Sequence, residues 1–120
     1  LLLRQGRRGM AVWLVVAVVG GMACNTVLKQ VFAAPRPDLL PHLDMVRSFS
    51  FPSGHSAGAM VLWGSIALLF RRSWLTAVAA ALIVLAGFSR VWLGVHWPTD
   101  VLAGWAGGLG WLALCWPLRP

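Results

Sequence analysis

Four long, uninterrupted apolar runs constrain this chain more than any other feature of its sequence. They cover residues 10–28, 54–70, 74–88 and 98–116, and hydrophobic residues make up 59% of the 120 positions. Only 11% of the residues are charged, against roughly 25% in an average soluble domain. Because a helix needs about 20 mainly apolar residues to span a bilayer, the runs predict membrane helices.

The predicted fold is all-α: a polytopic transmembrane helical bundle of about four spans, formed as one domain by residues 1–120. The runs are continuous and lack the alternation of apolar and polar residues that marks a membrane β-barrel. Gly104 and Gly108 are four residues apart in the last run. They therefore share one helix face and predict close contact with a neighbouring helix.

Proline and serine positions predict where the helices begin and end. The first helix is expected to end at Lys29, because Pro35 and Pro37 lack an N–H and restrict the residues before them. Ser53 and Ser73 precede the second and third runs. Both are expected to be helix N-caps, since a serine hydroxyl can accept a hydrogen bond from the first turn.

The charged residues divide by side if the runs cross the membrane alternately. One face receives six arginines and no acid: Arg4, Arg7, Arg8, Arg71, Arg72 and Arg119. The other receives Lys29, Arg36, Arg47, Arg90, Asp38, Asp44, Asp100, His42, His55 and His96. The positive-inside rule makes the first face cytoplasmic, so the ionisable groups face the periplasm or the cell exterior. The scattered cations form no basic stripe, which argues against a nucleic-acid partner.

Three polar clusters lie at the ends of the runs on that second face. In the first, Arg36 lies between two prolines, and a guanidinium held in a stiff segment suits bidentate phosphate binding. Lys29 alone also fits an interfacial lysine whose amine reaches the membrane surface. In the second, Ser53, Gly54 and His55 open a helix whose N-terminal N–H groups favour an anion. A plain helix cap with an interfacial histidine is the alternative.

The third cluster contains Arg90, His96 and Asp100. His96 and Asp100 are four residues apart, so one helical turn would place them on the same face. A carboxylate bonded to one imidazole nitrogen fixes the tautomer and leaves the other nitrogen as a nucleophile. A structural His–Asp pair is the alternative. Pro98 lies between the two residues and suits a first helical turn, so it places His96 at or just before the helix start.

Together the clusters resemble the signature of the type 2 phosphatidic acid phosphatase (PAP2) family, which shares its site with vanadium haloperoxidases. The signature reads Lys-x6-Arg-Pro, Pro-Ser-Gly-His and Ser-Arg-x5-His-x3-Asp. Residues 29–100 contain every fixed position in this order. Membrane members of the family typically have six spans. Four runs, with an apolar Leu1-Leu2-Leu3 and no initiator methionine, therefore indicate a C-terminal fragment of a longer protein.

The resemblance implies a division of labour among these residues. His96 would attack phosphorus, Asp100 would orient His96, and His55 would protonate the leaving group and then activate water. The phosphoryl oxygens would be held by Lys29, Arg36, Ser53, Gly54 and Arg90. No metal or other cofactor is expected.

The implied function is metal-independent hydrolysis of a lipid phosphomonoester or diphosphate in the cell membrane, through a phosphohistidine. Phosphatidate, phosphatidylglycerol phosphate and undecaprenyl diphosphate are all candidate substrates, and the oligomeric state is open. A lipid phosphotransferase using the same site and a catalytically inactive membrane scaffold are the alternatives. A haloperoxidase would use the same residues, but a short hydrophobic chain suits that soluble class poorly.

Overall fold

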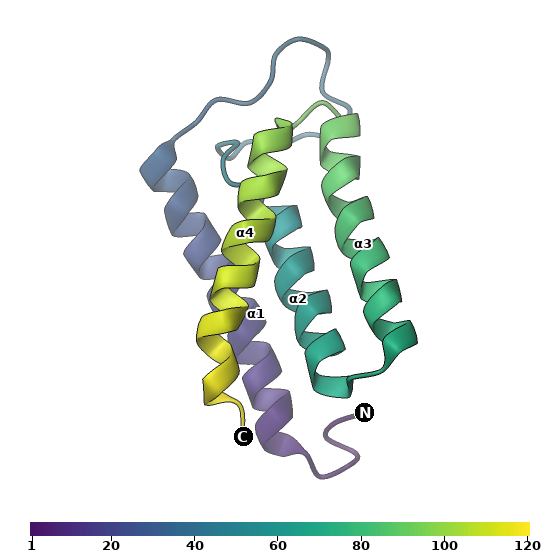
Figure 1. The fold of residues 1–120 in the computed structure, drawn as a ribbon. Coiled ribbons are helices and arrows are strands. Elements are labelled where there is room, and N and C mark those ends of the chain that lie inside the picture. The colour runs from purple at the N-terminus through teal and green to yellow at the C-terminus, as the bar shows by residue number, and fades with distance from the viewer.

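The structure, a computed structural model, describes residues 1–120 and contains four α-helices and no strand (Figure 1). Helix α1 spans Arg8–Phe32, α2 spans Gly54–Phe70, α3 spans Ser73–Trp92 and α4 spans Pro98–Cys115. A short 3-10 helix, Trp116–Leu118, follows α4. The all-α bundle predicted from the four apolar runs is confirmed.

Three of the helices are long and apolar enough to cross a membrane: α1, α3, and α4 with its 3-10 extension. Helix α2 has 17 residues and is shorter than the about 20 that span a bilayer. Large apolar side chains lie exposed on the outer faces of the bundle, among them Val12, Val16 and Val19 of α1 and Leu85 of α3. Such a surface is stable in contact with lipid chains or further apolar helices, whereas its exposure to water would be unfavourable.

The end of α1 differs from the prediction. The helix continues past Lys29 to Phe32, so Lys29 lies in its last turn. Ala33 then adopts a left-handed conformation, with φ of 45°, and its N–H donates to the carbonyl of Lys29. Ala34 precedes Pro35, and the proline ring disfavours helical backbone at that position. Pro35 therefore prevents the helix from continuing, as predicted, but α1 extends three residues further than expected, from Lys29 to Phe32.

The start of α3 also differs. Ser73 is the first residue of the helix, and Arg72 is the N-cap without any side-chain hydrogen bond, so the expected Ser73 cap is wrong. Arg71 closes α2 with a left-handed backbone, at φ of 48°, and the extended Arg72 then leads directly into α3 at Ser73. At the start of α2 the prediction is confirmed, because the Ser53 hydroxyl accepts from the N–H of Ser56 at 3.4 Å.

Helix α2 lies at the centre of the bundle and contacts the other three helices, most extensively α4. The glycine face predicted for α4 makes this contact. A Cβ atom at Gly104 would meet the carbonyl oxygen of Ser53, and one at Gly108 would meet that of Ala57. Backbone therefore packs on backbone along the α2–α4 contact, and this brings the start of α4 beside the start of α2.

The hydrophobic core lies towards the end of the bundle that holds both termini. Its buried members are Trp13, Ala17, Val61, Leu112 and Cys115. Two indole groups connect α1 to α4: Trp13 donates to the carbonyl of Cys115 at 2.9 Å, and Trp111 donates to that of Ala17 at 2.7 Å. These contacts hold the bundle together at the end opposite the polar clusters.

Alternation of the helices separates the connections into two groups (Figure 1). The termini and the short turn at residues 71–72 lie at one end, and the connections at 33–53 and 93–97 lie at the other. The six arginines without acids are therefore at the first end, as the sequence predicts. All three histidines and all three aspartates gather at the second, which we call the loop end.

Candidate active site

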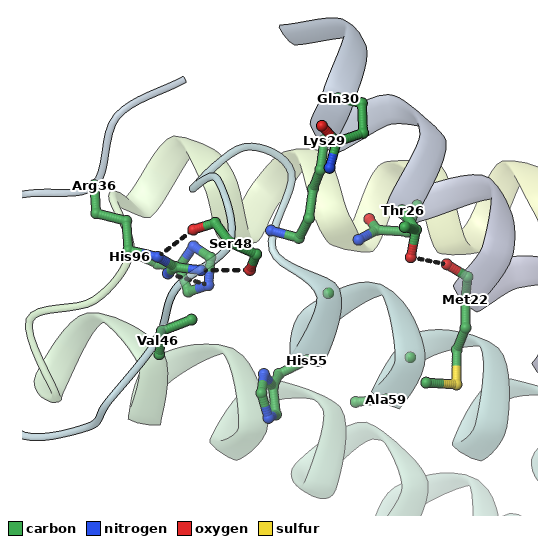
Figure 2. Close-up of a pocket in the computed structure, with 13 residues that line it drawn as sticks. Met22, Thr26, Lys29, Gln30, Arg36, Val46, Ser48, His55, Ala59 and His96 are labelled. Atoms are coloured by element: carbon green, nitrogen blue, oxygen red, sulfur yellow. Dashed lines mark hydrogen bonds between the residues drawn. The ribbon is translucent and has the colours of Figure 1, made fainter. Parts of the chain in front are cut away.

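A cavity of about 480 Å³ opens at the loop end, between α1, α2 and the long connection that follows α1 (Figure 2). Thirteen residues line it. Five of them were predicted as site residues: Lys29, Arg36, Gly54, His55 and His96. The structure therefore brings parts of all three polar clusters to one cavity, although they are separated by up to 67 positions in sequence (96 − 29).

His96 lies in the connection between α3 and α4, one residue before the N-cap Trp97. Pro98 is the first residue of α4 and Asp100 lies in the first turn, so the helix starts as the proline predicts. The imidazole Nδ1 is 3.2 Å from Asp100 Oδ2, and both side chains are almost completely buried. The same carboxylate oxygen accepts from the N–H of Trp97 at 2.8 Å.

The other ring nitrogen of His96 faces Arg36, whose NH1 is 3.1 Å from Nε2. A guanidinium can only donate hydrogen bonds, so Nε2 must be the acceptor and carries no proton. The proton is then on Nδ1 and is donated to Asp100. The lone pair of Nε2 therefore points towards the cavity, where it accepts a hydrogen bond from Arg36.

The surroundings of His96 keep its imidazole neutral. Burial, reinforced by the positive charge of Arg36, lowers the pKa of His96 to about 4, against the opposing effect of the Asp100 hydrogen bond. At neutral pH the ring is therefore unprotonated at Nε2, which agrees with the hydrogen-bond pattern. A neutral imidazole is the form that can attack an electrophile.

Backbone carbonyls of the two loop-end connections hold two cationic side chains at the cavity. Arg36 donates from Nε to the carbonyl of Ser48 at 2.8 Å and from NH1 to that of Val95 at 2.7 Å. Lys29 donates from Nζ to the carbonyls of Phe49 at 2.7 Å and Ser50 at 3.2 Å. Neither cation is paired with a carboxylate, so their charge remains available to an anion.

The N-terminus of α2 supplies the opposite wall of the cavity. His55 is exposed and, in Figure 2, lies across the cavity from His96 and Arg36. A Cβ at Gly54 would approach Asn25 Nδ2 at 3.3 Å, so glycine lets this helix start lie close to α1. Asn25 itself is buried and lines the cavity.

Two predicted phosphate ligands do not line the cavity. Ser53 is completely buried, and its hydroxyl accepts from the Ser56 hydroxyl at 3.0 Å. Arg90 is buried and donates from NH2 to Asp44 Oδ2 at 2.8 Å, while its Nε has no partner. This hydrogen bond lowers the pKa of the Asp44 carboxyl. Burial is the main cause of the lowered pKa of Arg36, and the positive charge of Arg90 adds to it. Arg90 therefore lies near the cavity that Arg36 lines.

Sequence reasoning missed two contacts of the long connection. Asp44 was assigned to no partner, yet it pairs with Arg90. Ser50 was unremarked, yet it is completely buried and its hydroxyl donates to Asp100 Oδ2. Neither residue belongs to a motif, and both contacts depend on the path of the connection, for which periodicity carries no signal.

The fold and the cavity together define the class of protein: a bundle of apolar, membrane-type helices with a cavity at one end. Two histidines and two cations line this cavity, and an aspartate is paired with one of the histidines. The chain belongs to the PAP2 superfamily, whose family model matches residues 10–120. The resemblance identified from the three clusters is therefore confirmed.

Several curated relatives are phosphatases by name. The chain is 42% identical over 94 residues to phosphatidylglycerophosphatase B of Bacillus subtilis, covering 71% of this chain and 46% of the relative. It is 37% identical over 91 residues to undecaprenyl-diphosphatase BcrC of the same organism, covering 70% and 45%. A lipid A 1-phosphatase of Rhizobium etli is 36% identical over 106 residues, covering 81% and 44%. The chain thus spans about half the length of the curated relatives it matches.

Solved structures have the same fold. A transmembrane PAP2-type phosphatidylglycerolphosphate phosphatase from Bacillus subtilis superposes with a TM-score of 0.80 at 36% identity, covering 88% of this chain and 56% of the other. Aquifex aeolicus LpxE superposes with a TM-score of 0.78, covering 92% and 69%; at 24% identity it supports the fold alone.

Proposed function

We propose that this chain carries the catalytic site of a metal-independent membrane phosphatase, which hydrolyses a lipid phosphomonoester or diphosphate through a phosphohistidine. The observation that carries the proposal is the unprotonated Nε2 of His96, directed towards Arg36 at the cavity and backed by Asp100. Family membership and the phosphatase names of the relatives support the same reaction.

In the first step, the Nε2 lone pair of His96 attacks phosphorus while the bond from phosphorus to the leaving oxygen breaks. His55, in its protonated form, donates a proton to that oxygen. In the second step, neutral His55 takes a proton from water, and the resulting hydroxide attacks the phosphohistidine. Inorganic phosphate leaves, and both histidines return to their starting protonation states.

Charge develops on the phosphoryl oxygens during both steps, and the cations at the loop end offset it. Arg36 already lies 3.1 Å from Nε2, so a phosphoryl group attacked by that nitrogen comes within its reach. Lys29 and the first two residues of α2, Gly54 and His55, also line the cavity, and the free N–H groups of a helix start would add donors to a phosphoryl group. Arg90 joins them once its hydrogen bond to Asp44 is exchanged for one to phosphate.

The shape of the cavity supports a lipid substrate. Its lining continues away from the histidines between α1 and α2, past Met22, Gly58 and Ala59. A Cβ at Gly58 would meet nothing within 4 Å, so this part is an open groove. A lipid chain fits such a groove while its phosphate remains beside His96. Relatives named for phosphatidylglycerophosphate, undecaprenyl diphosphate and lipid A indicate the range of head groups.

The charge distribution supports the orientation. Six arginines lie at the end of the bundle opposite the site, and by the positive-inside rule that end is cytoplasmic. The site would then act on lipids at the periplasmic or outer surface of the cell membrane.

The test is phosphate release from a panel of phosphatidate, phosphatidylglycerol phosphate and undecaprenyl diphosphate, with full-length protein in detergent. Wild type should release phosphate from at least one lipid, with inhibition by vanadate and none by a chelator. His96→Ala should lose at least about 10³-fold, because the nucleophile is gone. His42→Ala is the matched control: this imidazole is also at the loop end, in the connection that follows α1, but it contacts the Pro37 carbonyl and does not line the cavity, so activity should persist.

Turnover by His96→Ala at the wild-type rate would exclude the phosphohistidine route. Loss of wild-type activity in chelator would exclude the metal-independent mechanism. If folded wild-type protein releases phosphate from none of these lipids, the proposed function itself is wrong.

A further inference from the structure

Ser50 is a completely buried hydroxyl at the centre of the loop end, and the steps proposed above do not use it. It lies three residues before Ser53, outside the PAP2 signature. Its N–H donates to the carbonyl of Ala34 at 2.9 Å, and its own carbonyl accepts from Lys29 Nζ at 3.2 Å. The backbone around Ser50 is therefore fixed on both sides, and the hydroxyl has little freedom to choose its partners.

The hydroxyl of Ser50 contacts both members of the His–Asp pair. It donates to Asp100 Oδ2, and its oxygen is 3.5 Å from His96 Nδ1. Asp100 Oδ2 thus receives three hydrogen bonds: from the Ser50 hydroxyl, from the Trp97 N–H and from the His96 Nδ1–H. A carboxylate that accepts three hydrogen bonds on one oxygen is held in one rotamer.

The single proton of a serine hydroxyl can serve one acceptor at a time. Since it is donated to Asp100, the Ser50 oxygen presents lone pairs towards Nδ1. Two acceptors, Oδ2 and Oγ, then face Nδ1, and a protonated Nδ1 is the form that satisfies them. The Nδ1–H tautomer leaves Nε2 free, which is the arrangement deduced independently from Arg36.

From this geometry we infer that Ser50 is a positioning residue for the nucleophile: its hydroxyl locks the Asp100 carboxylate and the tautomer of His96. The effect grows during the reaction, because phosphorylation of Nε2 makes the imidazole ring cationic and the Asp100 carboxylate offsets that charge. Ser50 touches no substrate. The inference rests on the proposed function only in naming His96 as the nucleophile.

The first experiment compares Ser50→Ala with wild type on the best lipid of the panel. We expect kcat to fall about 10–100-fold, the size of loss found when the hydrogen-bond partner that orients a metal-bound histidine is removed, with KM within about 2-fold of wild type. Ser65→Ala is the matched control, because Ser65 is equally buried but its hydroxyl has no partner. That variant should keep wild-type kcat. Ser50→Cys, which retains a weak donor of similar size, should recover part of the loss.

The second experiment does not need turnover. Vanadate readily becomes five-coordinate and would do so here by accepting the Nε2 lone pair of His96, whereas inorganic phosphate would bind through the surrounding cations alone. Calorimetric titration of Ser50→Ala in detergent should therefore show at least about 10-fold weaker vanadate binding and phosphate binding within about 2-fold of wild type. A general structural defect would weaken both anions together.

The outcomes separate the two proposals. If wild type hydrolyses lipid phosphate and Ser50→Ala matches it in kcat and in vanadate affinity, Ser50 has no positioning function. If Ser50→Ala loses both anions equally, or Ser65→Ala falls as far, the effect is structural and the inference is wrong. If wild type hydrolyses no lipid, the proposed function fails, while selective loss of vanadate binding would still support the link from Ser50 to His96.

Discussion

Arg36 contacts His96 Nε2, the atom that acts as nucleophile in the proposed reaction. Its NH1 lies 3.1 Å from His96 Nε2, and the rest of the guanidinium donates to backbone carbonyls and to the Ser48 hydroxyl. These carbonyls fix the guanidinium plane before any anion arrives. A phosphoryl group entering beside Nε2 replaces a weak neutral acceptor with a charged one, so the guanidinium gains a stronger partner without leaving its position.

The positive charge of Arg36 also tunes His96, which gives a pH prediction. Protonation of Nε2 would remove the proposed nucleophile, and the pKa of His96 is lowered to about 4, first by burial and then by the charge of Arg36. The acid limb of kcat/KM assigned to His96 should therefore lie below the ordinary value of about 6.5. In Arg36→Gln the limb should move to higher pH, because a charge that opposes protonation is gone.

The measurement is the pH profile of kcat/KM for wild type and Arg36→Gln on the same lipid, so that ionisation of the substrate affects both equally. The absolute rate of the variant will also fall, and the midpoint of the limb carries the information. Arg47→Gln serves as control, since Arg47 is an exposed arginine of the same connection outside the cavity. A limb that stays in place in Arg36→Gln, or moves to lower pH, would contradict the assignment.

Single residues were predictable where a motif carried them and not elsewhere. Lys29, Arg36 and His96 combine residue types and spacings that chemistry requires, and the structure brings them to one cavity. Ser50 and Asp44 have no spacing to identify them. Their contacts follow from how residues 33–53 cross the loop end, and a serine or aspartate in a polar connection is equally compatible with a solvated position.

At the level of the helices, the contact between α2 and α4 sets the geometry of the site. The N–H of Ser53 donates to the carbonyl of Asp100 at 2.9 Å, which joins the start of α2 to the first turn of α4. Gly104 lies one turn further along α4, where a Cβ would be 2.6 Å from the Ser53 carbonyl oxygen. The distance between the two helix starts, and with it the position of His55 relative to His96, depends on that glycine.

Gly104→Ala should therefore push the two helices apart. We expect a loss of about 1–3 kcal/mol of stability, the usual cost of overpacking, and a lower kcat. Gly107→Ala is a matched control on the same helix, because a Cβ there meets nothing within 4 Å. Its stability should stay within about 1 kcal/mol of wild type. Unfolding midpoints in mixed micelles would measure both, and equal midpoints for the two variants would show that Gly104 makes no tight contact.

The glycine face was predictable because four-residue spacing places two positions on one side of any helix. Which neighbour it meets was not, since the spacing is the same for every partner. Helix ends were predictable to about a turn. Pro35 marks a boundary that α1 approaches as far as Phe32, and Ser73 enters α3 because Arg71 already closes α2 with a left-handed backbone, at φ of 48°.

For the whole molecule, the distribution of charged residues between the two ends of the bundle follows from the alternating direction of the four helices. Four antiparallel helices put the termini and residues 71–72 at one end and both longer connections at the other (Figure 1). That alternation needs no knowledge of packing, so the grouping of all histidines and acids at the loop end could be derived from sequence. What could not be derived is that the connection at 33–53 supplies the carbonyls and the carboxylate that hold Lys29, Arg36 and Arg90.

The same division predicts the orientation of the full-length protein in the membrane. In a background with every native cysteine of the full-length protein replaced by alanine, Cys24 and Cys115 included, a single cysteine is introduced as Arg72→Cys at the arginine-rich end or as Arg47→Cys at the loop end. A membrane-impermeant thiol reagent added to intact cells should label position 47 at once and position 72 only after permeabilisation, because the positive-inside rule predicts a cytoplasmic location for the arginine-rich end. The cysteine-free background should remain unlabelled under both conditions. The reverse pattern would place His96 at the inner surface, so a lipid phosphate presented there would have to be the substrate.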